Sequence, residues 1–480
     1  MKQPRYETVT LEKIVGGGQA LGTLADGRKA FVWNGLPGES VTFRITKKKS
    51  HFVEGIVTEV HKASPKRIAP LDPANYLSTS AWQIMSFDAE QHYKAALIEE
   101  AFELHDIVLP DMIDIYSDNI NDHYRNKVEF SWFGSTSTFA SNSNDSASFS
   151  EGSAFPAEAR QERELNQIAS GRPEEKDSDG VSGTYSNTLD LAFFQRGSKG
   201  KIIIDQCSLL PDSMMNLAHA VRDLLQTKPD ITARNLKTLL IRCDQQGNCV
   251  WQLYIKDELP DIISVDEAAA LPAQGGEVIY SDPRSPASRI TKRLTSFGDI
   301  VLSDTILDVP FRYATEGFFQ VNIPVYEQAL RDMREWVQDK PAIDLYSGVG
   351  TIGLTIGGDD VTLVEISEDA VREMRRNITE LGRESSAGAV LAPSEKALDE
   401  IHSDNLVIVD PPRAGLHADV IAKLLETAPE RIIYLSCNPV TQARDVALLA
   451  ETYGIRAHRG YNFFPRTPHI EHLVVLDKKA

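Results

Sequence analysis

The C-terminal third of the chain constrains its fold most, because strand-like and helix-like segments alternate there. Short apolar runs, which predict buried strands, are separated by longer amphipathic segments, which predict helices. The expected strands are 342–346, 361–366, 405–410 and 432–436, the expected helices are 324–338, 368–381, 417–427 and 440–453, and a final strand pair spans 456–476. This alternation is typical of a doubly wound, mainly parallel sheet, in which an antiparallel closing strand is normal.

The strand at 432–436 ends at Cys437, which is followed by Asn438 and Pro439. Asparagine and proline break a strand, so the thiol is expected at the rim of the sheet, where open α/β folds carry their reactive groups. A free cysteine is more commonly a small residue of the core. Its interpretation as a nucleophile therefore depends on what the neighbouring strands carry.

A glycine turn follows the strand at 342–346. Gly348 and Gly350 would let a ligand approach the backbone, and Glu365, 21 residues after Asp344, is placed to hold ribose hydroxyls. A tight structural turn is the alternative interpretation. The pattern predicts a nucleotide cofactor, and at this point both a nicotinamide and S-adenosylmethionine fit it.

The strand at 405–410 ends in Asp410-Pro411-Pro412-Arg413. Two prolines fix an extended turn, which would hold the Asp410 carboxylate at the edge of the sheet over the cofactor crevice. A purely structural strand end is the alternative. Hydride transfer has no use for a thiol one strand further along, whereas methyl transfer to an unreactive carbon does, so S-adenosylmethionine is favoured.

Residues 1–70 have a different pattern of short strands with glycine and proline turns, which predicts a small OB-like β-barrel. The expected strands are 7–11, 30–33, 40–45 and 52–60, with a turn at Gly16-Gly17-Gly18. A linker rich in Pro, Ala and Ser follows at 63–75.

The mixture of strand-like and helix-like segments in residues 71–315 predicts a central α+β domain. A helix is expected over 88–105, and we expect it to pack on the catalytic domain. A segment at 135–187, rich in Ser, Asn, Gly and acidic residues, interrupts the β pattern and predicts a disordered insertion with a helical piece at 157–168. A helix at 212–226 and a hairpin at 236–255 follow it.

Length and composition predict a soluble protein of two or three domains, because the chain has 480 residues, 42% of them hydrophobic. No signal peptide or run of 18 apolar residues occurs, so a cytoplasmic location is expected, without a membrane partner. The four cysteines do not form a disulfide framework or a zinc motif. Cys243 and Cys249 flank a turn, and in a reducing cytosol they are expected to be unpaired strand residues.

The net charge of −19 argues against a nucleic-acid partner until its distribution is considered. Residues 1–70 hold twelve Lys and Arg against six Asp and Glu, a balance of +6, which leaves −25 on the rest. A basic module on an acidic body is typical of proteins that bind RNA or DNA. The run Lys47-Lys48-Lys49 is part of this charge, although such a run can also be a solvated loop.

Five segments together resemble the uracil-5-methyltransferases of structural RNA, the family that makes 5-methyluridine in tRNA and large-subunit ribosomal RNA. The segments are Phe318 to Asn322, Asp344 to Gly350, Asp410 to Arg413, Ser436 to Pro439 and Phe464 to Glu471. The barrel also looks like a TRAM domain, and Tyr124 to Lys127 resembles the family's central RNA-contacting domain. The resemblance covers nearly everything except the insertion at 135–187. It implies a C-terminal Rossmann-like class I methyltransferase domain at 316–480.

The resemblance implies a role for each matching residue. Cys437 would add to carbon-6 of uracil, and Glu471 would remove the proton from carbon-5. The expected S-adenosylmethionine contacts are Gln320, Tyr346, Glu365 and Asp410 by resemblance, with Gly348, Gly350 and Thr351 of the glycine turn. The target uridine would be flipped out of folded RNA, and the expected RNA contacts are Lys47, Lys48, Lys49, Arg125 and Lys127.

One departure concerns the iron–sulfur cluster that several family members hold on four cysteines. The corresponding stretch, 71–91, has no cysteine, and Cys207 resembles an orphaned fourth ligand, so no cluster is expected. Ribosomal RNA is favoured over tRNA as the substrate, and the protein is expected to be a monomer. The alternatives are an RNA-binding or RNA-folding protein without turnover, a cytosine-5 RNA methyltransferase, and an amino-methylating enzyme, although Arg413 replaces the aromatic residue that the last class uses.

Overall fold

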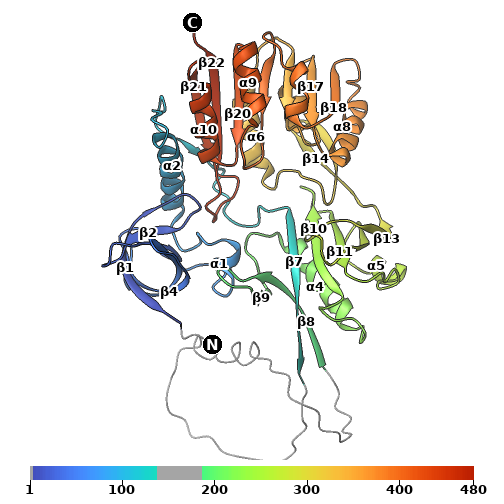
Figure 1. The fold of residues 1–480 in the computed structure, drawn as a ribbon. Helices are drawn as coiled ribbons and strands as arrows, with labels where there is room; N and C mark the ends of the chain where they lie inside the picture. Colours follow the sequence, from blue (N-terminus) through green and yellow to red (C-terminus); the bar gives the residue numbers. More distant parts are fainter. Residues whose placement is uncertain (1–3, 138–185) are drawn as a thin grey trace, which may run out of the picture.

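The computed structural model describes residues 4–137 and 186–480, and the strands of these residues form a closed barrel and three sheets. Figure 1 shows an eight-stranded sheet as the upper part, with the barrel and a seven-stranded sheet beneath it. The predicted helical piece at 157–168, and most of the predicted insertion, lie outside the described residues. In the described part of the chain, no helix is long and apolar enough to cross a membrane.

The barrel forms because its strands alternate buried apolar and exposed side chains. Its order is β1-β2-β3-β5-β4, which closes on itself. The strands are β1 (Tyr6–Ile14), β2 (Ala20–Thr23), β3 (Lys29–Trp33), β4 (Ser40–Lys48) and β5 (Phe52–Lys62). The predicted barrel is confirmed. The strand β2 was not predicted from the sequence. Its Gly22 lies so close to β1 that an added Cβ would meet the Thr10 carbonyl oxygen at 2.5 Å.

The seven-stranded sheet has the order β13-β12-β11-β10-β7-β8-β9, and α4 (Asp212–Gln226) packs on it. Its strands are β7 (Lys127–Ser137), β8 (Ser186–Phe194), β9 (Lys201–Ile203), β10 (Leu236–Cys243), β11 (Cys249–Ile255), β12 (Gly275–Tyr280) and β13 (Lys292–Gly298). The predicted helix and hairpin are confirmed. A separate pair, β14 (Val301–Ile306) and β15 (Val309–Ala314), leads to the C-terminal sheet.

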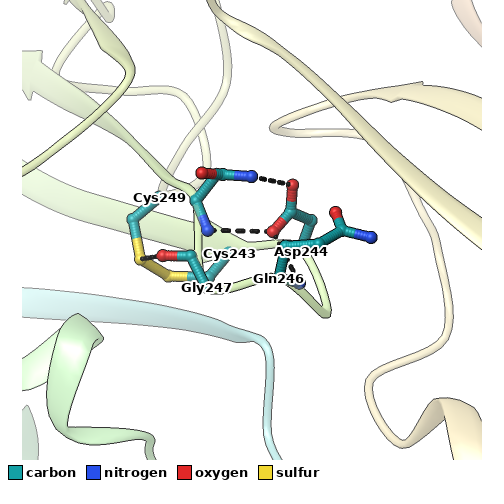
Figure 2. The surroundings of a disulfide bond; sticks show 6 residues. Cys243, Asp244, Gln246, Gly247 and Cys249 are labelled. Carbon is teal, nitrogen blue, oxygen red and sulfur yellow. Dashed lines mark hydrogen bonds between the residues drawn. A yellow bond between two sulfur atoms is a disulfide. The ribbon is translucent and has the colours of Figure 1, made fainter.

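Cys243 and Cys249 form a disulfide at the end of the β10–β11 hairpin (Figure 2). The expectation that they are unpaired strand residues was wrong. The turn between them is closed by Asp244, whose carboxylate accepts hydrogen bonds from the backbone N–H groups of Gln246 and Asn248 at 3.0 and 2.9 Å. This turn sets the two cysteines directly opposite each other, with their Cα atoms 4.0 Å apart.

The eight-stranded sheet has the order β18-β17-β16-β19-β20-β22-β21-β6. It is parallel from β18 to β20, and β22 lies antiparallel between β20 and β21. The strands are β6 (Ile115–Tyr116), β16 (Ala342–Leu345), β17 (Val361–Glu365), β18 (Ala387–Leu391), β19 (Leu406–Val409), β20 (Arg431–Ser436), β21 (Tyr453–Tyr461) and β22 (Glu471–Lys478). The predicted doubly wound sheet is confirmed, but the edge strand β18, rich in alanine and glycine, was missed.

Four helices of this sheet match predicted helices and differ from them at their ends, whereas the short helix Thr351–Ile356 was not predicted. The helices of this sheet are α6 (Ile323–Arg334), α7 (Thr351–Ile356), α8 (Glu368–Glu380), α9 (Ala418–Thr427) and α10 (Pro439–Leu449), with the short turns η1 (Ser394–Lys396) and η2 (Leu398–Glu400). Two further short helices among the described residues are α1 (Tyr76–Thr79) and α5 (Val265–Ala269).

The helix α2 (Phe87–Glu103) lies close to its predicted position at 88–105 and packs against α10 of the C-terminal sheet. The strand β6, which follows α2 in the chain, pairs with β21. One hydrophobic core therefore contains barrel residues such as Val9, α2 residues such as Phe102 and sheet residues such as Val474.

Candidate active site

A cavity of about 680 Å³ opens at the carboxyl ends of β16, β17, β19 and β20. Seven of the residues expected to act in catalysis or cofactor binding line it, namely Gln320, Tyr346, Gly348, Glu365, Asp410, Cys437 and Glu471. Four of them stand at or directly after the ends of neighbouring parallel strands. Glu471 joins them because β22 runs antiparallel to β20, with His472 opposite Ser436. The topology thus gathers residues that lie far apart in the sequence.

At one end of the cavity, the Glu365 carboxylate closes the glycine turn. It accepts hydrogen bonds from the backbone N–H of Gly348 at 3.0 Å and of Ser367 at 2.7 Å. A carboxylate accepts about four hydrogen bonds, so it can still accept from ligand hydroxyls. Gly348 has φ of +58° and nothing within 4 Å of an added Cβ, so its face is open to the cavity. This arrangement fits a ribose-bearing cofactor such as S-adenosylmethionine.

Gly350 and Thr351 do not line this cavity. Gly350, with φ of +89°, is the N-cap of α7, and an added Cβ would meet Leu354 at 3.0 Å. The Thr351 hydroxyl lies 2.8 Å from the Tyr326 hydroxyl. Both residues therefore support the turn on the side away from the cavity. Their direct contact with a cofactor stays a prediction.

Asp344 lies beneath the glycine turn and is fully buried. Its Oδ2 accepts from the Gly353 N–H at 2.9 Å, and its Oδ1 has no hydrogen-bond partner among the described residues. Burial raises the pKa of this carboxyl to about 8, and the charge of Asp410 acts in the same direction. Asp344 thus anchors α7 to the turn.

The segment that carries Gln320 is held by Arg242 of β10. This buried guanidinium donates to the carbonyl oxygens of Gly317 at 2.6 Å and Phe319 at 2.7 Å. Asn126 adds a hydrogen bond from its side-chain amide to the Gln320 carbonyl at 3.0 Å. The seven-stranded sheet therefore supports one wall of the cavity.

At the other end of the cavity, Cys437 is half-buried between β20 and α10. Asn438 caps α10 by accepting from the Val440 N–H at 3.2 Å, and its amide donates to the Arg413 carbonyl at 2.9 Å. The pKa of the Cys437 thiol is raised to about 12, first by burial and then by the charges of Glu471 and Asp410, while Arg413 opposes these effects. The thiol is therefore protonated at neutral pH in the free protein.

Glu471 and Asp410 are two carboxyl groups of the cavity, and the charge of Asp410 acts on Glu471. Burial raises the pKa of Glu471 well above its usual value, and the charge of Asp410 raises it further, while Arg413 lowers it. Burial also raises the pKa of Asp410, to about 7. Both carboxyl groups are therefore harder to ionise than free ones, which suits them to proton transfer.

Arg413 and His469 are cavity residues to which the sequence analysis gave no role. Their side chains approach each other, with Arg413 Nη2 3.4 Å from His469 Nδ1. Burial and the nearby Arg413 charge lower the pKa of His469 to about 4, so its ring is neutral. Arg413 ends the segment Asp410 to Arg413, and His469 lies in the segment Phe464 to Glu471. Their position in these two motifs is the feature of the sequence that could have indicated a role.

A second cavity, of about 660 Å³, shares residues such as Gln320 and Phe464 with the first. Arg125 and Lys127, two of the predicted RNA contacts, line it together with Arg196. The other predicted RNA contacts, Lys47, Lys48 and Lys49, do not line either cavity. They are exposed at the end of β4, where Lys47 pairs with Glu54 at 2.6 Å.

Cys207 is buried in the seven-stranded-sheet region, and burial raises its pKa to about 11. Within residues 4–137 and 186–480, no group of three or more His, Cys, Asp or Glu side chains is placed to hold a metal ion. That the protein binds no iron–sulfur cluster stays a prediction.

Comparison with known proteins adds to this geometry. The family model for tRNA (uracil-5-)-methyltransferase matches residues 394–479, which include Asp410, Cys437 and Glu471. A protein of Enterococcus faecalis, described as an uncharacterized RNA methyltransferase, is 26% identical over 93% of this chain and 92% of its own length. The C-terminal part of the chain is thus similar to the tRNA (uracil-5-)-methyltransferase family, and nearly its whole length is similar to RNA methyltransferases. A Porphyromonas gingivalis protein with the same description is 27% identical over 93% of this chain and 94% of its own length.

A solved structure shares the fold of this chain over nearly its whole length. It is the Pyrococcus abyssi tRNA (uracil-54, C5)-methyltransferase in complex with S-adenosyl-L-homocysteine. The TM-score is 0.71 at 19% identity, and the match covers 98% of this chain and 100% of that one. The similarity therefore extends beyond the C-terminal sheet.

Proposed function

We propose that the protein transfers a methyl group from S-adenosylmethionine to carbon-5 of a uridine in structural RNA, through a covalent bond between Cys437 and the base. The observation that carries this proposal is the single cavity that joins the Cys437 thiol, the Asp410 and Glu471 carboxyl groups, and the open Gly348 turn. Glu365 and Gly348 would hold the ribose of the cofactor, and Gln320, Tyr346 and Asp410 would complete its site.

Each residue has a defined task in this reaction. The Cys437 sulfur adds to carbon-6 while its proton passes to Asp410, and the electrons of the double bond move to carbon-5 and the carbon-4 carbonyl. S-adenosylmethionine, when bound, supplies an electrophilic methyl group for carbon-5. Glu471 then takes the carbon-5 proton, the 5,6 double bond forms again, and the sulfur leaves and recovers a proton from Asp410. Arg413 favours the ionised forms of both Cys437 and Glu471.

The remaining parts of the chain would bind RNA. We assign residues 1–70 to a TRAM domain, 71–315 to the central RNA-contacting domain and 316–480 to the methyltransferase domain. Arg125 and Lys127 would contact phosphates near the flipped uridine, and Lys47, Lys48 and Lys49 would extend the contact along the backbone. Ribosomal RNA is our preferred substrate over tRNA, and we expect a cytoplasmic monomer without an iron–sulfur cluster.

Two measurements test this function. Nucleoside mass spectrometry of ribosomal RNA and tRNA from a deletion strain should reveal the loss of one 5-methyluridine, which also identifies the RNA. With that RNA and a labelled methyl donor, the purified protein should transfer label to uridine. Binding of the RNA without transfer of label would favour an RNA-binding or RNA-folding protein, and label in cytidine would favour a cytosine-5 enzyme.

A further inference from the structure

The segment between β21 and β22, residues 462–470, leads directly into Glu471, and we call it the catalytic loop. It contributes Phe464 and His469 to the active-site cavity. Arg466 in this loop has φ of 65°, a left-handed conformation that is uncommon for a residue with a side chain. Such a conformation persists where surrounding contacts hold it.

Glu90 and Lys94 of α2 supply such contacts. Both side chains are fully buried, and they form an ion pair at 3.1 Å. Lys94 Nζ donates to Asn462 Oδ1 at 2.5 Å and to the Phe464 carbonyl at 3.1 Å. The Glu90 carboxylate accepts from the Arg466 backbone N–H at 3.0 Å and from the Asn462 amide at 2.9 Å. The pair therefore binds the catalytic loop at three residues.

The barrel reaches the same loop through Trp82. Its backbone N–H donates to the Arg466 carbonyl, and its indole N–H donates to the Gly18 carbonyl, both at 3.0 Å. Gly18 belongs to the β1–β2 turn, and a Cβ added there would lie 2.3 Å from Pro468 Cβ. The glycine turn of the barrel thus packs directly against the catalytic loop.

A buried ion pair loses the hydration free energy of two charges, so it is an unfavourable way to pack a helix. Burial lowers the pKa of Lys94, and the Glu90 charge opposes this shift. Apolar residues of similar volume often stabilise a core as well or better. The hydrogen bonds of Glu90 and Lys94 to the catalytic loop are what apolar residues could not supply.

We propose that Glu90 and Lys94 are positioning residues, which hold the catalytic loop so that Glu471 meets the carbon-5 proton of the bound uracil. This inference rests on the proposed function, in which Glu471 acts after methyl transfer. Cys437 and the glycine turn stand on other strand ends, so the loss of the pair should leave adduct formation and methyl transfer intact. It should slow only the step that releases the product.

The test follows labelled methyl from the donor into RNA, using unmodified bulk RNA from a deletion strain as the probe. Denaturing gels separate label in the protein–RNA adduct from label in released RNA. In Lys94→Met, the ratio of adduct breakdown to adduct formation should fall by about 10- to 100-fold, because a displaced general base loses most of its effect. The Michaelis constant for the donor should stay within about twofold of wild type.

The control and the second variant separate positioning from stability. Glu100→Gln removes the ion pair of α2 with Lys13 of the barrel, away from the catalytic loop, and should partition label as wild type does. Glu90→Gln/Lys94→Met removes both charges of the buried pair together, so it keeps the test valid if Lys94→Met does not fold. It should also accumulate adduct.

Two results would overturn the inference. In the first, both Lys94 variants partition label as wild type and Glu100→Gln do. In the second, adduct formation and breakdown fall together, which is what a loss of stability alone would cause. A failure of the proposed function looks different, because wild-type protein would then form no labelled adduct and release no labelled RNA.

Discussion

The two ends of the active-site cavity are built in different ways. The glycine turn at the cofactor end is local, because Glu365 binds Gly348 and Ser367 within one strand–helix–strand unit of the sheet. The nucleophile end is assembled from distant parts, since Glu90 and Lys94 of α2 hold the loop before Glu471. Figure 1 shows α2 beside the strands and helix of the C-terminus, although they are separated by most of the chain. The loop before Glu471 is thus held by residues of the N-terminal half.

The largest effect should come from removing the nucleophile. Cys437→Ala should lower methyl transfer by at least about 10³-fold, because loss of a covalent catalyst removes the reaction path itself. RNA binding should persist, since Arg125 and Lys127 lie in the neighbouring cavity. Label transfer and RNA affinity, measured on the same preparation, check this. A variant with normal activity would show that the thiol is a core residue.

A substitution at the cofactor end should change the Michaelis constant for the methyl donor. Glu365→Ala removes a carboxylate that binds two backbone N–H groups and, in our proposal, the ribose. Charge-assisted hydrogen bonds contribute about 1.5–3 kcal/mol, so the Michaelis constant for the donor should rise about 10- to 100-fold. The fraction of label held in the adduct should not change. An increase in the fraction of label held in the adduct would show that Glu365 also affects adduct breakdown, which would contradict the proposed difference between the two ends.

The stability of the cofactor end should depend on pH through Asp344. Its pKa is raised to about 8 in the folded protein, above the usual value of 3.8, so the folded state binds a proton that the unfolded state has lost. Stability is therefore fully present below about pH 4 and is lost as pH rises toward 8, with a slope of up to about 1.4 kcal/mol per pH unit from this group. Asp344→Asn should flatten the slope in denaturant titrations from pH 5 to 8. An unchanged slope would contradict the assignment.

The barrel turn offers a matched pair of variants for the nucleophile end. Gly18→Ala would push a methyl group into Pro468, whereas Gly17→Ala, with φ of +90° against +91°, meets nothing within 4 Å. Backbone strain is therefore similar in both variants. Gly18→Ala alone should slow adduct breakdown, by several-fold, in the labelled-methyl assay. Equal effects of the two variants would mean that the barrel does not support the catalytic loop.

The smallest effect should come from the exposed lysines of the barrel. Lys48→Ala should weaken RNA binding across sequences and reduce the slope of log affinity against log salt by about one. The rate at saturating RNA should stay as in wild type. Filter binding at several salt concentrations measures the slope, and an unchanged slope would place the RNA path elsewhere.

The cofactor end was predictable because its signals are local. The spacing from Gly348 to Glu365, and the apolar strands before them, specify a strand, a turn and an acid at the next strand end. The same argument placed Asp410 and Cys437 at the rim. Gly350 and Thr351 belong to the same turn but do not line the cavity, and a glycine turn does not reveal which of its residues face a ligand.

The contacts at the nucleophile end of the cavity could not be predicted from the sequence, because they depend on the tertiary structure. A charged pair four residues apart, such as Glu90 and Lys94, is typical of an exposed helix face. Nothing in the nearby sequence indicates that this pair contacts a loop more than 350 residues away. The disulfide was missed for a related reason. The expectation came from the redox compartment, whereas the pairing of Cys243 with Cys249 depends on hairpin register.

The most direct test of the account is the chemical identity of the trapped intermediate. Glu471→Gln protein, incubated with unmodified RNA and S-adenosylmethionine, should form a complex that survives denaturation. Mass spectrometry after nuclease and protease digestion should then find a methylated uridine joined to the peptide that contains Cys437. A fully active Glu471→Gln protein without adduct, or an adduct on Cys207 instead of Cys437, would contradict the proposed reaction.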